Sequence, residues 1–210
     1  MEEICISMVY LGPIAYYNAL GKANTVLLEQ YEYYEKQSYR NRCNIAGPNG
    51  VLSLSIPVEK KTGDKTVIRD IRISEHGEWQ MQHWKSIESA YNSTPFFEYY
   101  KDDFIGFYHK KWNFLWDFNL ELQATILDLL ELEPSIKFTS DYNIILKENC
   151  LDLRQSFHPK KENLQISNTP YYQVFEQRFG FQPNLSIIDL LFNMGNESQL
   201  IIQQEIIHSL

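Results

Sequence analysis

Residues 37–58, QSYRNRCNIAGPNGVLSLSIPV, predict a β-ribbon around which the rest of the chain is organised. A Gly-Pro-Asn-Gly turn, Gly47–Gly50, separates two strand-like runs. Glycine and asparagine tolerate the positive φ angles of tight turns, so this turn is a strong hairpin signal. The second run ends near Pro57, and its apolar side chains alternate along the strand: Leu52, Leu54, Ile56 and Val58.

Four polar or aromatic residues precede the ribbon: Tyr39, Arg40, Asn41 and Arg42. Successive side chains on a strand point to opposite faces, so Arg40 and Arg42 are expected to share one face and Asn41 to lie on the other. Two guanidinium groups on one face offer forked donors to a carboxylate or a phosphate. Arg69 or Arg72 from a neighbouring strand would complete this predicted anion site. The alternative is a set of solvent-facing strand charges.

The first thirty residues indicate a βαβ unit. Residues 4–11 are rich in β-forming side chains, Gly12 and Pro13 end that run, and a helix is predicted from Ile14. Residues 24–30 then have the pattern of a second buried strand. A strand, a short helix and a strand favour a parallel pair in an α/β sheet. Gly12 would then lie at the carboxyl edge of that sheet, where open α/β sheets bind ligands.

Helical periodicity dominates the middle of the chain. Trp79, His83, Ile87 and Tyr91 recur four residues apart and predict one buried helix face. Further helices are predicted within 96–111 and 112–132, and the three together are expected to cover one face of the sheet.

Shorter elements complete the expected fold. Strands are predicted at 66–74, 136–139 and 151–154, and a loop at 158–163. A helix is predicted from Leu185, with Asn184 as its cap and Gly195 as its end, before a final helix at 197–208. The sequence therefore predicts an α/β fold, a single domain over residues 1–210. Its mixed, largely parallel central sheet carries a β-ribbon and is flanked by helices.

Composition limits the class of protein. The chain has 210 residues, 44% of them hydrophobic, a formal net charge of −8 and a pI near 5.2. This acidic balance argues against nonspecific nucleic-acid binding, which needs a basic face. Three widely spaced cysteines without a CxxC pair indicate reduced thiols. The acidic N-terminus is unlike a signal peptide, and its apolar run is too short to span a bilayer. A cytoplasmic protein without membrane insertion is expected.

His83, beside Trp84 and Lys85, is the candidate catalytic residue. A histidine can act as a general base near neutral pH, and the lysine could steady an anion. The alternative is a buried, hydrogen-bonded structural histidine, because His83 shares the apolar face of its helix. The other histidines are scattered, so neither a metal site nor a cofactor is expected. The nucleophile motif GxSxG and the phosphate loop GxxxxGK[ST] are both absent.

Several motifs occur together in one order along residues 4–196: QSYRNRCNI with the Asn49-Gly50 turn, IRDIRI, HWKSIESAY, PFFEYY and LSIIDLLFNMG. In these the chain resembles the WbqC-like family. The resemblance singles out these polar positions: Tyr39, Arg40, Asn41, Arg42, His83, Trp84, Tyr91 and Asp189. The chain departs from the family in its opening YLGPIAYY and in a short segment over 143–170. If that segment helps to bind a donor, this protein uses another donor or is inactive.

The resemblance implies a transferase of bacterial O-antigen or other surface polysaccharide synthesis, transferring an aminoacyl (glycyl) group to a nucleotide-linked amino sugar. On this hypothesis Arg40 and Arg42 hold an anionic group of the substrate and His83 deprotonates the acceptor. The remaining expected substrate contacts are Tyr39, Asn41, Arg72, Trp84 and Tyr91. Arg40→Ala would then weaken substrate binding far more than it lowers thermal stability. The alternative is a non-catalytic protein that binds or assembles enzymes of the same pathway.

Overall fold

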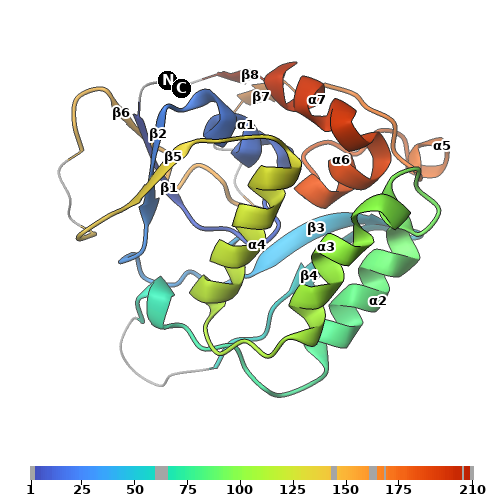
Figure 1. Ribbon diagram of the computed structural model, residues 1–210, viewed down its shortest axis with the longest axis horizontal. Helices are drawn as coiled ribbons and strands as arrows, with labels where there is room; N and C mark the ends of the chain where they lie inside the picture. The colour runs from blue at the N-terminus through green and yellow to red at the C-terminus, as the bar shows by residue number, and fades with distance from the viewer. Residues whose placement is uncertain are drawn as a thin grey trace.

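A four-stranded sheet forms one side of the molecule (Figure 1). The computed structural model describes residues 3–59, 66–142, 146–160, 165–167, 169–204 and 206–208; part of the loop predicted at 158–163 and of the segment 143–170 lies outside these ranges. The strands are β1 (Glu3–Ser7), β2 (Thr25–Glu29), β5 (Ser135–Phe138) and β6 (Cys150–Asp152). Their order is β5-β2-β1-β6 and every pairing is parallel. The predicted α/β fold with a largely parallel sheet is confirmed.

The βαβ opening is confirmed as well. Helix α1 (Ile14–Lys22) connects β1 to β2, which pair in parallel with Ile4 opposite Val26. Ile4 and Ile6 are fully buried, as expected for a central parallel strand that is covered on both faces. Because β2 and β5 lie on one side of β1 and β6 on the other, the direction of the chain's connections reverses next to β1.

The predicted β-ribbon is confirmed too. Strands β3 (Arg42–Gly47) and β4 (Gly50–Ser55) pair antiparallel, with Gly47 opposite Gly50. Gly50 has a φ of 105°, in the region that favours glycine. The turn therefore needs the glycine that the sequence places there. Cys43 and Ile45 of β3 are fully buried, whereas most of β4 is exposed. The ribbon therefore presents β3 to the core and β4 to solvent.

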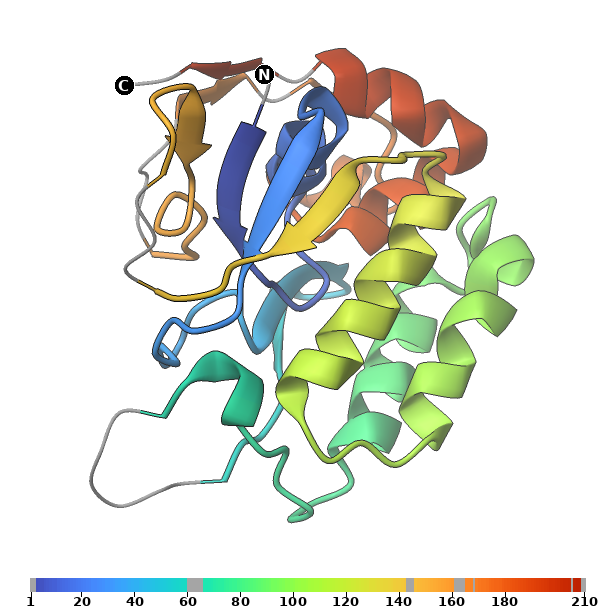
Figure 2. The same cartoon turned by 60° about the vertical axis from the view of Figure 1, so that its left-hand side comes forward.

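Three long helices lie where the sequence places them: α2 (Trp79–Tyr91), α3 (Phe97–His109) and α4 (Leu115–Leu129). In Figure 2, α4 lies beside the sheet, and α2 and α3 lie on the far side of α4. The ring of Trp116 on α4 contacts that of Phe138 on β5, with centroids 6.1 Å apart. The predicted face of α2 is buried along its whole length. No helix among the described residues is long and apolar enough to cross a membrane.

The predicted strand over 66–74 is wrong. The chain forms a 3₁₀ helix, η1 (Ile68–Asp70), flanked by isolated bridges from Val67 to Tyr33, Arg72 to Phe114 and Ile73 to Val58. Each bridge has a different partner, so no continuous ladder forms. Ile71 and Ile73, which belong to the alternating apolar pattern, are nevertheless both buried.

The structure of the C-terminal region agrees in part with the prediction from the sequence. Helix α6 (Ile187–Met194) ends at Gly195, which has a φ of 57°, as predicted. Asn184, predicted as its cap, lies three residues before the helix at a φ of 54°, and Ser186 takes the cap position. The remaining elements are α5 (Glu176–Phe179), the 3₁₀ helix η2 (Gly195–Glu197), α7 (Ser198–Gln204) and the antiparallel strands β7 (Gln165–Ser167) and β8 (Ile206–His208). The predicted final helix therefore ends at Gln204.

Candidate functional site

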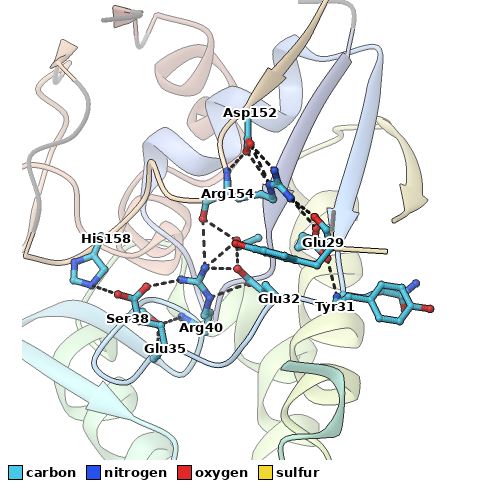
Figure 3. Close-up of polar contacts among 12 residues, drawn as sticks. Glu29, Tyr31, Glu32, Glu35, Ser38, Arg40, Asp152, Arg154 and His158 are labelled. Atoms are coloured by element: carbon cyan, nitrogen blue, oxygen red, sulfur yellow. Dashed lines mark hydrogen bonds and ion pairs between the residues drawn. The ribbon is translucent and has the colours of Figure 1, made fainter. Parts of the chain in front are cut away.

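Polar side chains gather at the carboxyl edge of the parallel sheet, each at or just beyond a strand end. Ser7 ends β1, Glu29 ends β2, Thr139 follows β5 and Arg154 follows β6. Figure 3 shows the contacts of Arg154 with Glu29 and Asp152 and those of Arg40 with Glu32. Open α/β sheets bind ligands outside the carboxyl ends of their strands, next to the point where the connections reverse direction. Because that reversal lies next to β1, this group, with Glu32 and Arg40, is the candidate site.

A buried ion pair between Glu32 and Arg40 forms the floor of the site. Both residues are 2% exposed. Arg40 Nε donates to Glu32 Oε1 at 2.9 Å and Nη2 pairs with Oε2, so the contact is bidentate. Ser7 Oγ donates to Glu32 Oε2 at 2.9 Å and accepts from Arg40 Nη2 at 3.1 Å. Burial raises the pKa of Glu32 above its usual range, and the hydrogen bonds and charge of Arg40 oppose that rise.

A second pair joins strands β2 and β6. Arg154 Nη1 donates to Glu29 Oε2 at 3.2 Å, while Nε and Nη2 donate to the Asp152 carboxylate at 3.0 and 2.6 Å. Burial acts to raise the pKa of Asp152, but the hydrogen bonds and charge of Arg154 outweigh it and lower the pKa. The Arg154 carbonyl accepts from Arg40 Nη2 at 3.4 Å, and it lies 2.8 Å from Ser7 Oγ, whose single proton it shares with Glu32. The two ion pairs therefore form one connected network.

The rim of the site carries exposed acidic and aromatic groups. The Glu35 side chain is 37% exposed and lies 3.5 Å from Arg40 Nη1 and 3.8 Å from His158 Nε2. Tyr33 is 50% exposed and Tyr142 is 39% exposed, and their ring centroids lie 6.5 Å apart. The ionic part of the site around Glu32 and Arg40 is thus buried, and the tyrosine rings and the Glu35 carboxylate beside it are exposed.

Carboxylates outnumber guanidinium groups in this network. Glu29, Glu32, Glu35 and Asp152 surround Arg40 and Arg154. The nitrogen atoms of both guanidinium groups are directed at these carboxylates and at protein oxygens. With all groups ionised, two negative charges remain in excess. The edge therefore favours a cationic group over a phosphate.

The sequence model of the WbqC-like protein family matches residues 9–161 and 153–201. The chain belongs to this family. An uncharacterised protein of Mycobacterium tuberculosis (strain ATCC 25618 / H37Rv), Rv1507c, is 24% identical over 216 residues, covering 90% of this chain and 92% of its own. No solved structure matches the chain significantly.

The arginines that the WbqC-like motif singles out do not lie together as predicted. Strand β3 begins at Arg42, and Arg40 lies in the preceding turn, so the expected shared strand face is wrong. Arg40 points inward to Glu32, whereas Arg42 Nε donates to Ser55 Oγ on the exposed side of the ribbon. The exposed Arg72 has its guanidinium 4.8 Å from the Phe114 ring centroid.

Tyr39 and Asn41, predicted to contact substrate, are buried beside the ribbon. The Tyr39 carbonyl accepts from the Tyr10 amide at 2.8 Å, and Asn41 Nδ2 donates to the Ile56 carbonyl at 2.8 Å. These contacts fix the path of the chain between the sheet and the ribbon.

His83 and Trp84 lie in the aromatic core of the WbqC-like fold. The His83 ring is 5.1 Å from Trp79, centroid to centroid, and its Nδ1 is 2.9 Å from the Tyr10 hydroxyl. Burial lowers the pKa of His83 to about 4, and a hydrogen bond to the Ser55 backbone opposes that change. The ring is therefore neutral at pH 7. Trp84 stacks on Phe97, with centroids 6.0 Å apart. A catalytic role for His83 stays a prediction.

Two other motif positions, Tyr91 and Asp189, meet in the interior. The Tyr91 hydroxyl donates to Asp189 Oδ1 at 2.9 Å, and the Tyr171 hydroxyl and Gln173 Nε2 donate to Oδ2 at 2.6 and 3.1 Å. Burial raises the pKa of Asp189 to about 6, although these three hydrogen bonds act to lower it. The contact joins α2 to α6 and supports their packing.

His83 and Asp189 predict opposite effects of pH on stability. The pKa of His83 is lower folded than unfolded, so its contribution is present above about pH 6.5 and is lost as pH falls towards 4. The pKa of Asp189 is higher folded than unfolded, so its contribution is present below about pH 4 and is lost as pH rises towards 6. Each of these two contributions to the free energy of unfolding amounts to about 3 kcal/mol. In the wild type their changes with pH partly cancel.

Single variants separate the two effects. Relative to wild type between pH 7 and 4.5, His83→Gln should gain stability as pH falls, and Asp189→Asn should lose it. Urea unfolding at several pH values measures both, since other carboxylates cancel in each comparison. Identical pH profiles for wild type and both variants would contradict the buried environments described here.

The sequence missed the main residues of the carboxyl edge. Glu29, Glu32, Asp152 and Arg154 carry no local motif, although two lie at predicted strand ends. The signal that could have found them is their position, because each ends a parallel strand or lies just beyond one. Instead, Gly12 was singled out at that edge.

Proposed function

We propose that the protein is a transferase of bacterial surface polysaccharide synthesis that modifies the amine of a nucleotide-linked amino sugar. The amine binds at the acidic carboxyl edge of the sheet. The observation that carries this proposal is the excess of carboxylates over guanidinium groups at a ligand-binding position of the fold. Membership of the WbqC-like family adds to it through the polysaccharide role that the resemblance implies.

The rim supplies two groups that suit an ammonium ion. The Asp152 side chain is 44% exposed and the Glu35 side chain 37% exposed, whereas Glu29 and Glu32 are buried. An incoming ammonium group donates up to three hydrogen bonds, and either of these exposed carboxylates can accept from it. The buried pairs hold the rim in place.

Tyrosine rings and one arginine suit the rest of such a substrate. Tyr33 and Tyr142 expose ring surface beside the carboxylates, and aromatic rings pack against the apolar face of a sugar. The guanidinium of Arg69 lies 5.1 Å from the Tyr31 ring centroid, its Nε lies 3.8 Å from the exposed Asp70 carboxylate, and its side chain is 44% exposed. It is an accessible cation for the diphosphate.

The chemistry assigned to the edge is acyl transfer to nitrogen. The ammonium gives one proton to a rim carboxylate, which acts as general base. The free amine attacks the carbonyl carbon of the acyl donor, a new C–N bond forms, and the bond from that carbon to its leaving group breaks. The leaving group departs with the bonding electron pair and takes up the second proton that the nitrogen loses, so that a neutral amide remains.

The test is a thermal-shift comparison of UDP-glucosamine, UDP-N-acetylglucosamine and UDP. A ligand that binds the native state raises Tm with concentration. We expect UDP-glucosamine to raise Tm most, because only it carries a free amine. Asp152→Asn should remove most of that difference, whereas the matched exposed residue on α4, Asp128→Asn, should leave it unchanged.

Two outcomes would count against the proposal. Equal shifts with all three ligands would show that the nucleotide alone is recognised and that the amine is not. No shift with any nucleotide sugar, together with capture of enzymes of a polysaccharide pathway, would support the alternative role as a binding or assembly protein.

A further inference from the structure

The β-ribbon leaves one strand edge open. Among the described residues β4 pairs with β3 alone, so the second edge of β4 has no strand beside it. The outer edge of β3 is covered, because the Asn44 carbonyl accepts from the Ser186 amide at 2.8 Å. The Ala46 amide on the same edge donates to the Tyr91 hydroxyl at 3.1 Å. We infer that a second copy of this chain pairs with the open edge of β4, and this inference does not depend on the proposed transferase activity.

The register of the ribbon shows which backbone groups of β4 face outward. Asn44 and Ala46 use their backbone groups on the outer edge of β3, so these residues form no hydrogen bond to β4. They lie opposite Ser53 and Val51. In an antiparallel pair, two opposite residues that are not bonded to each other direct their N–H and C=O groups outward on both strands. The backbone groups of Val51 and Ser53 therefore point out of the ribbon.

The open edge lacks the features that keep strand edges from pairing. Natural edge strands carry charged side chains or proline, which disfavour the approach of another strand. Strand β4, GVLSLS, has neither. The edge strands of the four-stranded sheet do carry charges, Lys137 on β5 and Asp152 on β6. Val51 is 54% exposed and Leu52 is 40% exposed, so β4 also offers apolar side chains to a partner strand.

The side chains of β4 favour its own copy over a foreign peptide. A foreign strand is selected by side-chain pockets or charged groups beside the edge. Strand β4 has no charged side chain, and β3 already engages both of its serine hydroxyls. Ser53 Oγ donates to Asn44 Oδ1 at 2.6 Å, and Ser55 Oγ accepts from Arg42 Nε at 3.0 Å. A two-fold axis places a strand against itself, so a charged strand would meet its own charge. An uncharged strand avoids that repulsion, although the whole chain has a net charge of −8.

Two copies then form one four-stranded antiparallel sheet. The Ser55 backbone is already hydrogen-bonded to His83, so the pairing centres on residues 51–53. Val51 of each copy lies opposite Ser53 of the other, each such pair exchanges two hydrogen bonds, and the two Leu52 side chains meet at the axis. An interface on one short strand is smaller than the roughly 800 Å² per partner of a standard complex, so we expect a weak dimer with a Kd of about 10–100 μM.

Sedimentation velocity of the whole chain, from about tenfold below to tenfold above this Kd, tests the inference. The average mass of the wild type should rise from 24.9 kDa towards twice that value. Ser53→Lys and Ser53→Glu should each stay monomeric, because their like charges meet diagonally across the axis. An equimolar mixture of the two variants should dimerise again, since opposite charges then meet. A site for a foreign peptide would not show this recovery.

A control variant and a folding check make the result specific. Ser135→Lys places the same charge at an exposed position on the β5 edge and should dimerise as the wild type does. Ser53 is exposed, so both of its variants should keep the circular dichroism spectrum of the wild type. A wild type that stays monomeric at every concentration would overturn the inference. A dimer that both Ser53 variants leave intact, or a mixture of the two that stays monomeric, would overturn it as well.

Discussion

Replacing Arg40 with alanine should lower the free energy of unfolding by about 3–5 kcal/mol, which is the usual cost of removing one partner from a buried ion pair. Glu32 would remain 2% exposed with its carboxylate unpaired and burial already raising its pKa. For a chain of this length, the loss corresponds to a fall in Tm of roughly 10 °C. Urea unfolding and a thermal melt both measure it.

Arg42→Ala is the matched control, because it removes the other arginine of the same motif. Arg42 makes one hydrogen bond at the exposed side of the ribbon, so its loss should cost about 0.5 kcal/mol or less. A double variant, Arg40→Ala with Glu32→Gln, should recover part of the loss because no buried charge remains. Equal stabilities for the two single variants would show that Arg40 is not buried against Glu32. The buried pair with Glu32 thus predicts a large loss of stability for Arg40→Ala, where the sequence alone predicts an effect mainly on ligand binding.

Phe192→Ala should cost a similar amount, about 3–5 kcal/mol, by leaving a cavity where three helices meet. Phe192 on α6 is fully buried, and its ring centroid lies 5.3 Å from that of Tyr91, 5.2 Å from Phe97 and 5.5 Å from Phe104. These partners come from α2 and α3, so the loss should be accompanied by looser packing of both helices. Chemical unfolding gives the magnitude, and near-ultraviolet circular dichroism reports the packing.

Phe179→Ala is the control for the aromatic core. Phe179 is 36% exposed at the end of the short helix α5, so its removal should cost less than about 1 kcal/mol. A loss for Phe192→Ala no larger than for Phe179→Ala would contradict the helix arrangement described here.

The elements that could be predicted from the sequence are those determined by residues close together along the chain. The β-ribbon follows from the Gly47–Gly50 turn and the alternation after it, both of which are local. Helix α2 follows from side chains four residues apart, and His83 is enclosed because it shares that face with Trp79. The long helices and the first parallel pair could be predicted for the same reason.

The candidate site could not be predicted because its contacts join distant segments. Arg154 reaches Glu29 across 125 positions of the sequence, and the connection depends on the order of the strands, which periodicity does not reveal. The alternation of side chains along a strand does not extend to Arg40, because β3 begins only at Arg42 and Arg40 lies in the preceding turn. The alternation of apolar and polar residues within a strand does not reveal which way the side chains of the preceding turn point.

A crystal structure of the protein with UDP-glucosamine would show directly where the amino sugar binds. We expect the sugar at the carboxyl edge, its nitrogen within about 3 Å of the Asp152 or Glu35 carboxylate and its ring against Tyr33 or Tyr142. A sugar nucleotide bound elsewhere, with the amine away from these carboxylates, would contradict the assignment of the site.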